Sequence, residues 1–264
     1  MTYHPESVPA KLPYNQDTME NAEHPSSRAF LSAEWRDLLL LNYEVDPRLL
    51  RPHVPPGTEL DSFNGRSYAS LVGFRFLRTR LAGIFPVPLH TNFDEVNLRF
   101  YVRRSVAGEI RRGVVFIREI VPRRAIALAA NLIYSENYIR LPMRHRVEKA
   151  ETAIAAEYAW RVDRNSACIR AQSTGTPALA AEASLEQFIT EHYWGYNRRR
   201  SGGGTEYRVE HARWQVWAAS NAAFEGDASA VYGPPWAPVL ARKPDSAFLA
   251  DGGPVLVYSG HRIC

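Results

Sequence analysis

Phe93-Asp94-Glu95-Val96-Asn97-Leu98-Arg99-Phe100-Tyr101-Val102 is the stretch that decides how this chain folds and whether it holds an internal site. Read as a β-strand, it places its side chains alternately on two faces. One face is purely apolar (Val96, Leu98, Phe100 and Val102), and the other, here called the polar row, is Glu95, Asn97, Arg99 and Tyr101. A strand of a globular protein usually turns such a row to water. If both faces are covered, the row lines an internal cavity instead; the strand by itself favours the solvent-facing interpretation.

The composition is that of a globular protein with a sizeable core. The chain has 264 residues, of which 45% are apolar and 11% aromatic, enough for one large β-rich domain or two small ones. No run of 18 apolar residues is present, so no membrane-spanning helix is expected. Residues 1–28 are polar, contain prolines and lack the apolar segment of a signal peptide. We therefore expect a loose N-terminal arm on a cytoplasmic protein.

The chain is basic through arginine rather than lysine. Lys11, Lys149 and Lys243 are the only lysines among 32 basic residues, and the formal net charge is +4. The arginines are scattered among acids and form no continuous basic face of the kind that nucleic-acid binding requires. Cys168 and Cys264 offer neither metal-ligand spacing nor a disulfide framework. The sequence therefore predicts no nucleic-acid partner and no membrane partner.

The pattern along residues 29–264 predicts one α+β domain, mainly of antiparallel strands. Hairpin turns are expected at Asn64-Gly65 and Ala107-Gly108. A short helix should follow Asp46-Pro47, and a capping box at Ser184 to Gln187 should open a helix to about Tyr196. The remaining expected elements are a buried helix over 125–134 and strands over 35–45, 59–63, 67–78, 93–103, 110–121, 143–149, 152–162, 167–172, 206–210, 213–218 and 255–258.

Several motifs occur in a recognisable order. They are Phe63-Asn64-Gly65, the segment 92–99, Ile117-Arg118-Glu119-Ile120-Val121-Pro122-Arg123-Arg124, Thr190-Glu191-His192-Tyr193-Trp194, and the segment 209–214. Together they resemble the acetoacetate decarboxylase-like superfamily and, more closely, a bacterial branch of uncharacterised proteins within it, over about Phe30 to Tyr258. The resemblance implies a cone-like antiparallel β-barrel wrapped by further sheet, with a few short helices and a central cavity. It thus favours an internal polar row.

The resemblance also marks a departure from the decarboxylases. Those enzymes form a Schiff base through a lysine in an Arg-Glu…Pro-Lys-Lys motif, where a second lysine activates the first. The matching positions here are Arg118-Glu119 and Pro122-Arg123-Arg124, so both lysines are replaced by arginine. A guanidinium stays protonated and cannot form an imine at ordinary pH. We therefore expect no Schiff-base chemistry.

The arginines that stand at these positions suit an anionic ligand. Arg123 and Arg124 offer planar forks for a carboxylate or phosphate. Glu95, which resembles the family's cavity glutamate, is the candidate catalytic base, and Arg99 lies about 13 Å from it along the same face. The candidate ligand-binding residues are Arg99, Tyr101, Arg118, Glu119, Arg123 and Arg124. In the alternative interpretation, Glu95, Arg118 and Arg123 neutralise one another in a structural ion network, since buried charges persist when paired.

Three functions remain open at this point. The first is a cavity that binds a small anionic, carboxylate-type molecule; the second is a lyase or decarboxylase acting through Glu95 and arginines; the third is a non-catalytic structural or interaction protein with a packed barrel. No cofactor is expected. His192 and His211 each neighbour a glutamate, but adjacent residues do not place metal ligands on one face, so no metal site is expected either. The arm is compatible with exchange between subunits of a homo-oligomer.

Overall fold

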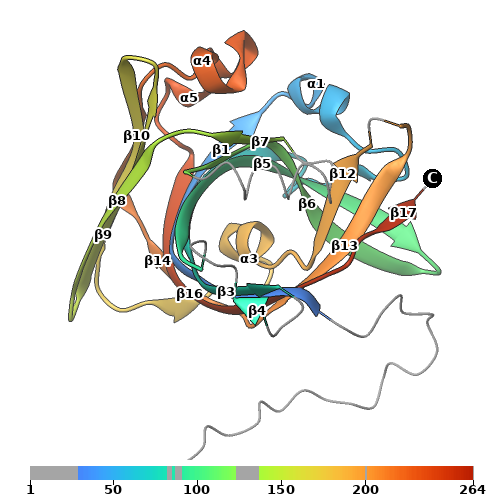
Figure 1. Cartoon of the computed structure of the whole chain (residues 1–264), viewed down its shortest axis with the longest axis horizontal. Helices are drawn as coiled ribbons and strands as arrows, with labels where there is room; N and C mark the ends of the chain where they lie inside the picture. The colour runs from blue at the N-terminus through green and yellow to red at the C-terminus, as the bar shows by residue number, and fades with distance from the viewer. Residues whose placement is uncertain (1–28, 82–84, 87–90, 123–136, 200, 264) are drawn as a thin grey trace, which may run out of the picture.

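The computed structural model of the chain describes residues 29–81, 85–86, 91–122, 137–199 and 201–263. The expected arm over 1–28 and the expected helix over 125–134 lie outside these residues. Strands that are mostly antiparallel dominate the structure, with a few short helices (Figure 1). The expected α+β class is therefore confirmed. None of the helices in the described ranges is long and apolar enough to cross a membrane.

The large sheet contains the polar row. Its longer strands are β1 (Ala29–Val45), β3 (Ser67–Leu81), β5 (Phe93–Val106), β6 (Glu109–Val121), β12 (Trp194–Arg198), β13 (Gly204–His211) and β16 (Ser246–Tyr258). Its shorter strands are β2 (Glu59–Leu60), β4 (Phe85–Pro86), β7 (Tyr138–Arg140), β11 (Ala178–Leu179), β14 (Gln215–Ala218) and β17 (His261–Ile263). The polar row therefore sits in a strand with neighbours on both sides, β3 and β6.

The hydrogen-bonded ladder of the large sheet returns to its start. It runs from β16 through β1, β3, β5, β6 and β12 to β13, which pairs again with β16. Figure 1 looks down the resulting ring. Asp37 in β1 and Arg78 in β3 have positive φ and lie where the pairing of these strands shifts register. Such bulges increase local twist and bend, which long strands need in order to curve into a ring.

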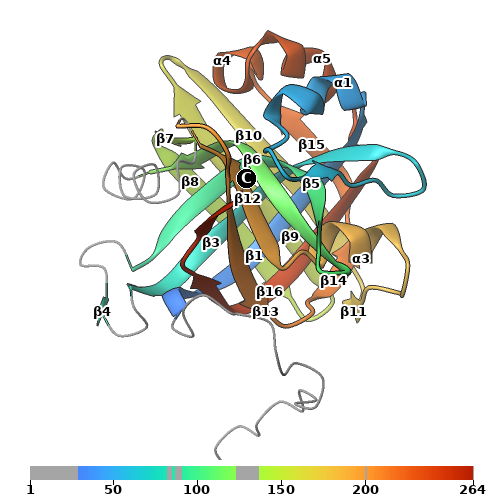
Figure 2. The same ribbon diagram turned by 90° about the vertical axis from the view of Figure 1, so that its right-hand side faces the viewer.

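A second sheet lies against the outside of the ring. It has the order β15-β10-β9-β8, with β8 at Met143–Ala150, β9 at Ala153–Val162, β10 at Asn165–Thr174 and β15 at Ser220–Glu225. The apolar face of β5 packs into the core between the two sheets, against side chains that include Tyr158, Trp160 and Ile169. The helical segments α1 (Pro47–Leu50), η1 (Arg51–His53), α4 (Ser229–Tyr232), η2 (Pro234–Trp236) and α5 (Ala237–Leu240) complete this layer, and Figure 2 places α1, α4 and α5 on one side of the ring.

The helix α3 (Leu185–Thr190) closes one end of the ring (Figures 1 and 2). Its expected cap is confirmed, because the Ser184 hydroxyl accepts a hydrogen bond from Gln187 N at 3.2 Å. The Gln187 side chain accepts from Ala183 N, one residue before the serine. Phe188 and Ile189 enter the cluster of apolar side chains that fills the ring.

Several expected boundaries are wrong; the strand expected from residue 35, for example, begins at Ala29. Tertiary pairing explains two further differences. The helix opened by Ser184 does not reach Tyr196, because β12 begins at Trp194 and pairs with β13 and β6. The last long strand begins at Ser246 rather than 255, because Gly252 and Gly253 keep the pairing of β16 with Arg36 and Trp35 of β1, although Gly252 has a positive φ. A Cβ at Gly252 would lie 2.0 Å from the Trp35 carbonyl oxygen, so only glycine fits there.

The parallel contact between β6 and β12 closes the ring over only two residue pairs, Trp194 with Gly113 and Gly195 with Val114. A Cβ at Gly113 would lie 2.5 Å from the Trp194 carbonyl oxygen. Gly113→Ala should therefore lower the free energy of unfolding by about 1–3 kcal/mol in urea denaturation, as overpacking does. Gly253→Ala is the matched control, since its Cβ would meet Trp214 at an ordinary 3.7 Å. Equal stability of the two variants would contradict this account of ring closure.

Candidate functional site

The polar row faces the interior of the ring, so the solvent-facing interpretation is wrong. The exposed fractions of Glu95, Asn97, Arg99 and Tyr101 are 2%, 2%, 9% and 1%. The apolar face is covered by the second sheet, and the polar face is enclosed because the strands close around it. Within the ring, Tyr101 packs among apolar side chains that include Val72, Phe74 and Phe248. The row is thus a polar line in an otherwise largely apolar enclosure.

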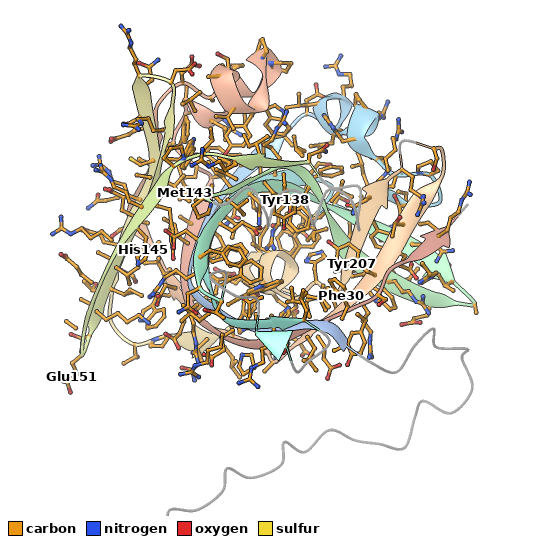
Figure 3. All side chains as sticks on the ribbon, in the orientation of Figure 1. Phe30, Tyr138, Met143, His145, Glu151 and Tyr207 are labelled. Atoms are coloured by element: carbon orange, nitrogen blue, oxygen red, sulfur yellow. The ribbon has the colours of Figure 1, made fainter. Side chains whose placement is uncertain are left out.

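Carboxylates gather at one end of the polar row. Glu95 accepts hydrogen bonds from Asn97 Nδ2 at 3.0 Å and from the Tyr138 hydroxyl at 3.3 Å. Glu119 of β6 stands opposite Asn97 and beside Tyr138 of β7, and it is fully buried. Figure 3 shows Tyr138 within the outline of the ring. The structure therefore brings together two predicted site residues, Glu95 and Glu119, with Tyr138, which is not among the candidate site residues.

Arg99 lies further along the row, beside the helix that closes the ring. Its Nη2 donates to the Ile189 carbonyl oxygen at 3.2 Å, and its guanidinium lies 5.8 Å from the centre of the Tyr101 ring. Its Nε has no hydrogen-bond partner, and among the described residues no carboxylate pairs with it. Tyr101 is anchored by a 2.6 Å hydrogen bond between its hydroxyl and Ser70 Oγ. The row therefore contains a buried cation, Arg99, that no described acid neutralises.

Arg118 does not join the polar row. Arg118 and Glu119 are neighbours in β6 and so point to opposite faces of the strand; Arg118 stands opposite Leu98, whereas Glu119 stands opposite Asn97. Arg118 therefore points to the apolar face of β5, where its charge acts on Tyr232 of α4. The expected ion network of Glu95, Arg118 and Arg123 cannot include Arg118 in this arrangement.

Arg123 and Arg124 lie outside the described residues. Their roles as carboxylate-binding forks stay predictions.

His192 is a residue of the ring interior whose role the sequence analysis missed. It follows α3, is 7% exposed, and its ring centre lies 4.7 Å from that of Tyr101 and 5.5 Å from that of Phe188. Neither ring nitrogen has a hydrogen-bond partner. Burial lowers the pKa of His192 well below its usual range, and the charge of Arg99 lowers it further. The imidazole is therefore neutral at ordinary pH. Its signals in the sequence were its place just after a capped helix and within the motif 190–194.

A structural ion network does exist, at another position. The fully buried Glu206 accepts from Arg104 at 2.9 Å and from Arg111 at 2.7 Å, and His261 lies 3.3 Å away. Arg104 and Arg111 are opposite one another across the hairpin. Two like charges directly opposite one another destabilise a strand pair, so an anion shared by both arginines is favourable. The hairpin turn expected at Ala107-Gly108 sets this pairing, and the sequence therefore already indicated that such an anion is needed. This network joins the β5–β6 hairpin to β13 and β17.

The described lysines lie outside the ring interior. Lys149 binds Asp37 at 2.7 Å and Asp251 at 2.5 Å where β8 meets the ring. Burial opposes the charge of Lys149, but the hydrogen bonds to Asp251 and Asp37 outweigh it and raise the pKa of the ammonium group. Lys243 is exposed. Lys149 therefore lacks the lowered pKa of an imine-forming amine, and neither lysine has the position of one.

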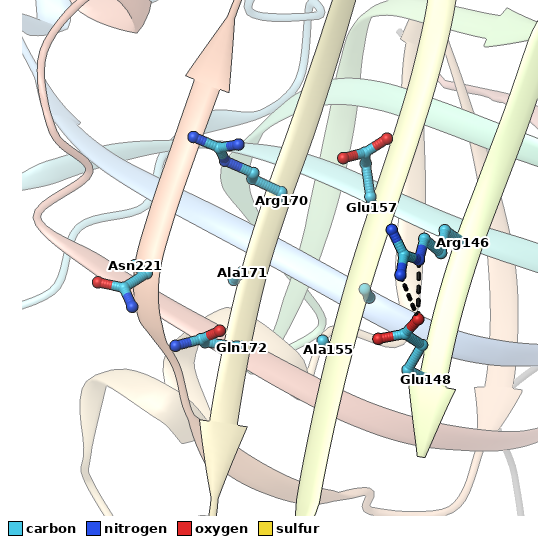
Figure 4. A pocket seen from close by; sticks show the side chains of 9 residues that line it. Arg146, Glu148, Ala155, Glu157, Arg170, Ala171, Gln172 and Asn221 are labelled. Atoms are coloured by element: carbon cyan, nitrogen blue, oxygen red, sulfur yellow. Dashed lines mark hydrogen bonds and ion pairs between the residues drawn. The ribbon is translucent and has the colours of Figure 1, made fainter.

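An open groove of about 460 Å³ crosses the second sheet (Figure 4). Its walls include Arg146, Glu157 and Arg170, and Ala155 lies in its floor. Arg146 is paired with Glu148 at 2.6 Å. The groove shares no residue with the polar row and offers no unpaired buried charge. In the described ranges, no three His, Cys, Asp or Glu side chains gather as metal ligands.

The lowered pKa of His192 predicts acid sensitivity. The unfolded state takes up a proton near pH 6.5, whereas the folded state resists it. Stability should therefore be full above about pH 6.5 and fall as pH decreases, by up to about 1.4 kcal/mol per pH unit for this residue. His53 and His211, whose pKa values are also lowered by burial, add to the slope. Urea denaturation between pH 5 and 7 should show a shallower slope for His192→Gln; an unchanged slope would contradict the assignment.

Solved structures with this fold include acetoacetate decarboxylases and similar enzymes. The acetoacetate decarboxylase of Legionella pneumophila matches with a TM-score of 0.59 and 13% identity, over 95% of this chain and 94% of its own. An acetoacetate decarboxylase-like enzyme from Sphingomonas wittichii RW1 has a TM-score of 0.62 and 12% identity, over 88% and 92%. The enduracididine biosynthesis enzyme MppR, complexed with pyruvate, has a TM-score of 0.60 and 14% identity, over 93% and 94%. These identities show the fold alone, and the expected fold is confirmed.

Sequence comparison identifies the branch. The uncharacterised protein YqjF of Bacillus subtilis (strain 168) is 27% identical over 207 residues, which are 78% of this chain and 81% of YqjF. The sequence profile of DUF2071, whose members are described as uncharacterised conserved proteins, matches residues 32–254. The chain therefore belongs to the DUF2071 family, a branch of uncharacterised proteins with an acetoacetate decarboxylase-like fold.

Proposed function

We propose that the interior of the ring binds a small organic molecule with a carboxylate group, held by Arg99 and not by a Schiff base. The observation that carries this proposal is the state of Arg99, a buried guanidinium that no described carboxylate neutralises. A charge enclosed in protein is costly unless an opposite charge pairs with it. A bound carboxylate would supply that charge and accept hydrogen bonds from the guanidinium fork.

The rest of the polar row suits an extended ligand. Asn97 Oδ1 has no hydrogen-bond partner although it is buried, and such atoms in a native interior call for a partner that the protein does not provide. Glu95 lies about 13 Å from Arg99 along the strand, where it can accept a proton or a hydrogen bond from the far end of a ligand. The enduracididine biosynthesis enzyme MppR, which has this fold, is solved in complex with the carboxylate pyruvate, and this supports a carboxylate as the ligand class.

Three features favour a mechanism without an imine. The positions of the lysine pair are held by Arg123 and Arg124. Lys149 is fixed between two carboxylates that raise its pKa, which opposes the role of a nucleophilic amine. Lys243 is exposed on the surface. A Schiff base is therefore not part of the proposed function.

A lyase or decarboxylase acting through Glu95 is the second candidate, favoured by one observation. Glu95 is a buried carboxylate that Asn97 and Tyr138 orient toward the ring interior, as a general base requires. Release of carbon dioxide from β-keto acids by the purified protein, lost in Glu95→Gln, would establish this activity. Ligand binding without any carbon dioxide release would restrict the protein to a binding role or to another reaction.

The binding proposal is tested by thermal shift against a panel of keto acids, other carboxylates and phosphates. A ligand at a hundred times its dissociation constant stabilises the folded state by about 2.7 kcal/mol, which should raise the melting temperature by several degrees. Arg99→Met should remove the shift, because it removes the guanidinium but keeps an apolar stem of similar length.

Arg103→Met is the matched control. Arg103 belongs to the same strand, four residues beyond Arg99, but it is partly exposed and pairs with Glu59 at 2.8 Å. This variant should keep the ligand-induced shift. A panel without any stabilising carboxylate, or a hit whose shift persists in Arg99→Met, would contradict the proposed function and favour a packed interior.

A further inference from the structure

His192 lies next to the proposed anion site and shares its surroundings. Its ring contacts Tyr101, the same side chain over which the Arg99 guanidinium lies. The Ile189 carbonyl oxygen, three residues before His192, accepts the hydrogen bond from Arg99. The end of α3 contacts the Arg99 guanidinium, and the residues that follow α3 place the His192 imidazole. Both groups therefore lie beside the Tyr101 side chain.

The hydrogen-bonding capacity of His192 is unused. Both Nδ1 and Nε2 are buried without a partner, although a neutral imidazole has one donor and one acceptor. Most buried polar side-chain atoms in native structures have a partner. The half-buried His211 shows the usual state, since its Nδ1 lies 2.8 Å from the Ala212 carbonyl oxygen. The unused nitrogens of His192 thus indicate a partner other than the protein.

The charges that act on His192 are all cationic or neutral. They come from Arg99 of β5, Arg112 of β6 and His211 of β13, and its flat neighbours are Tyr101 and Phe188. No carboxylate in the described part of the chain is among them. Arg112 is turned toward Asp61, at 3.4 Å, whereas Arg99 has no such partner. An anion placed beside Arg99 would therefore be the first negative charge that His192 meets.

We propose that His192 is a second binding residue for the carboxylate held by Arg99, and that binding of the anion is coupled to uptake of a proton by His192. This inference rests on the proposed function. The ligand-free ring disfavours the imidazolium because burial and Arg99 oppose a second positive charge. A carboxylate reverses the balance, since it pairs with both cations and accepts a hydrogen bond from the imidazolium. Linkage then requires that anion affinity rise as pH falls.

Calorimetric titration with acetate, pyruvate and benzoate, in buffers of different ionisation enthalpy, measures this coupling. At pH 6 the wild-type protein should take up a fraction of a proton per bound anion, and affinity should increase by up to about tenfold per unit decrease in pH. His192→Gln should bind with no proton uptake and a flat pH profile. His53→Gln is the matched control: His53 is also partly buried with a lowered pKa, but it lies in η1 outside the ring, and this variant should keep the wild-type uptake.

Nuclear magnetic resonance of the wild-type imidazoles gives a second readout that needs no variant at position 192. The pKa of His192 should rise when the probe is present, and Arg99→Met should abolish that rise. Binding that depends on Arg99 but takes up no proton, and leaves the His192 titration unchanged, would overturn this inference and leave the proposed function intact. Failure of all three probes to bind in an Arg99-dependent way would overturn both.

Discussion

The closure of the ring around β5 is the constraint on which the rest depends. A strand paired on both sides, with a second sheet on one face and a closed ring on the other, turns neither face to water. The charged groups of Glu95 and Arg99 and the amide of Asn97 are consequently held where hydration by water is lost. Each side chain therefore needs a hydrogen-bond or ion-pair partner, which either the protein or a bound ligand must supply.

Two buried charged residues, Glu206 and Arg99, differ in whether the protein supplies such a partner. Glu206 is fully buried, but Arg104 and Arg111 neutralise it and so fix the β5–β6 hairpin against β13. Arg99 has only a backbone carbonyl and an aromatic ring, and the neighbouring His192 has unused nitrogens. The first arrangement is complete and therefore structural. The second is incomplete in the protein alone, which is the condition expected of a binding site that trades stability for function.

Much of the architecture follows from local sequence chemistry. The alternation in 93–102, the turns at 64–65 and 107–108, and the Ser184 cap all predicted what the structure contains. The direction of the polar row could not be read from the strand, because it depends on β13 meeting β16 far away in the sequence. Alternation puts Arg118 and Glu119 on opposite faces, but which of them faces the interior, like the position of His192 against Tyr101, is set only by tertiary pairing.

The most direct measurement is the free energy of unfolding of Arg99→Met without ligand, by urea denaturation at neutral pH. If the counter-ion of Arg99 is a bound ligand, the ligand-free folded protein carries the uncompensated desolvation cost of the guanidinium. The variant removes that cost. It should then be as stable as the wild type or more stable, by up to about 1–4 kcal/mol, as when buried charges are replaced by apolar groups. A loss of about 3–5 kcal/mol, the cost of breaking a buried ion pair, would show that Arg99 is structural and would contradict the account.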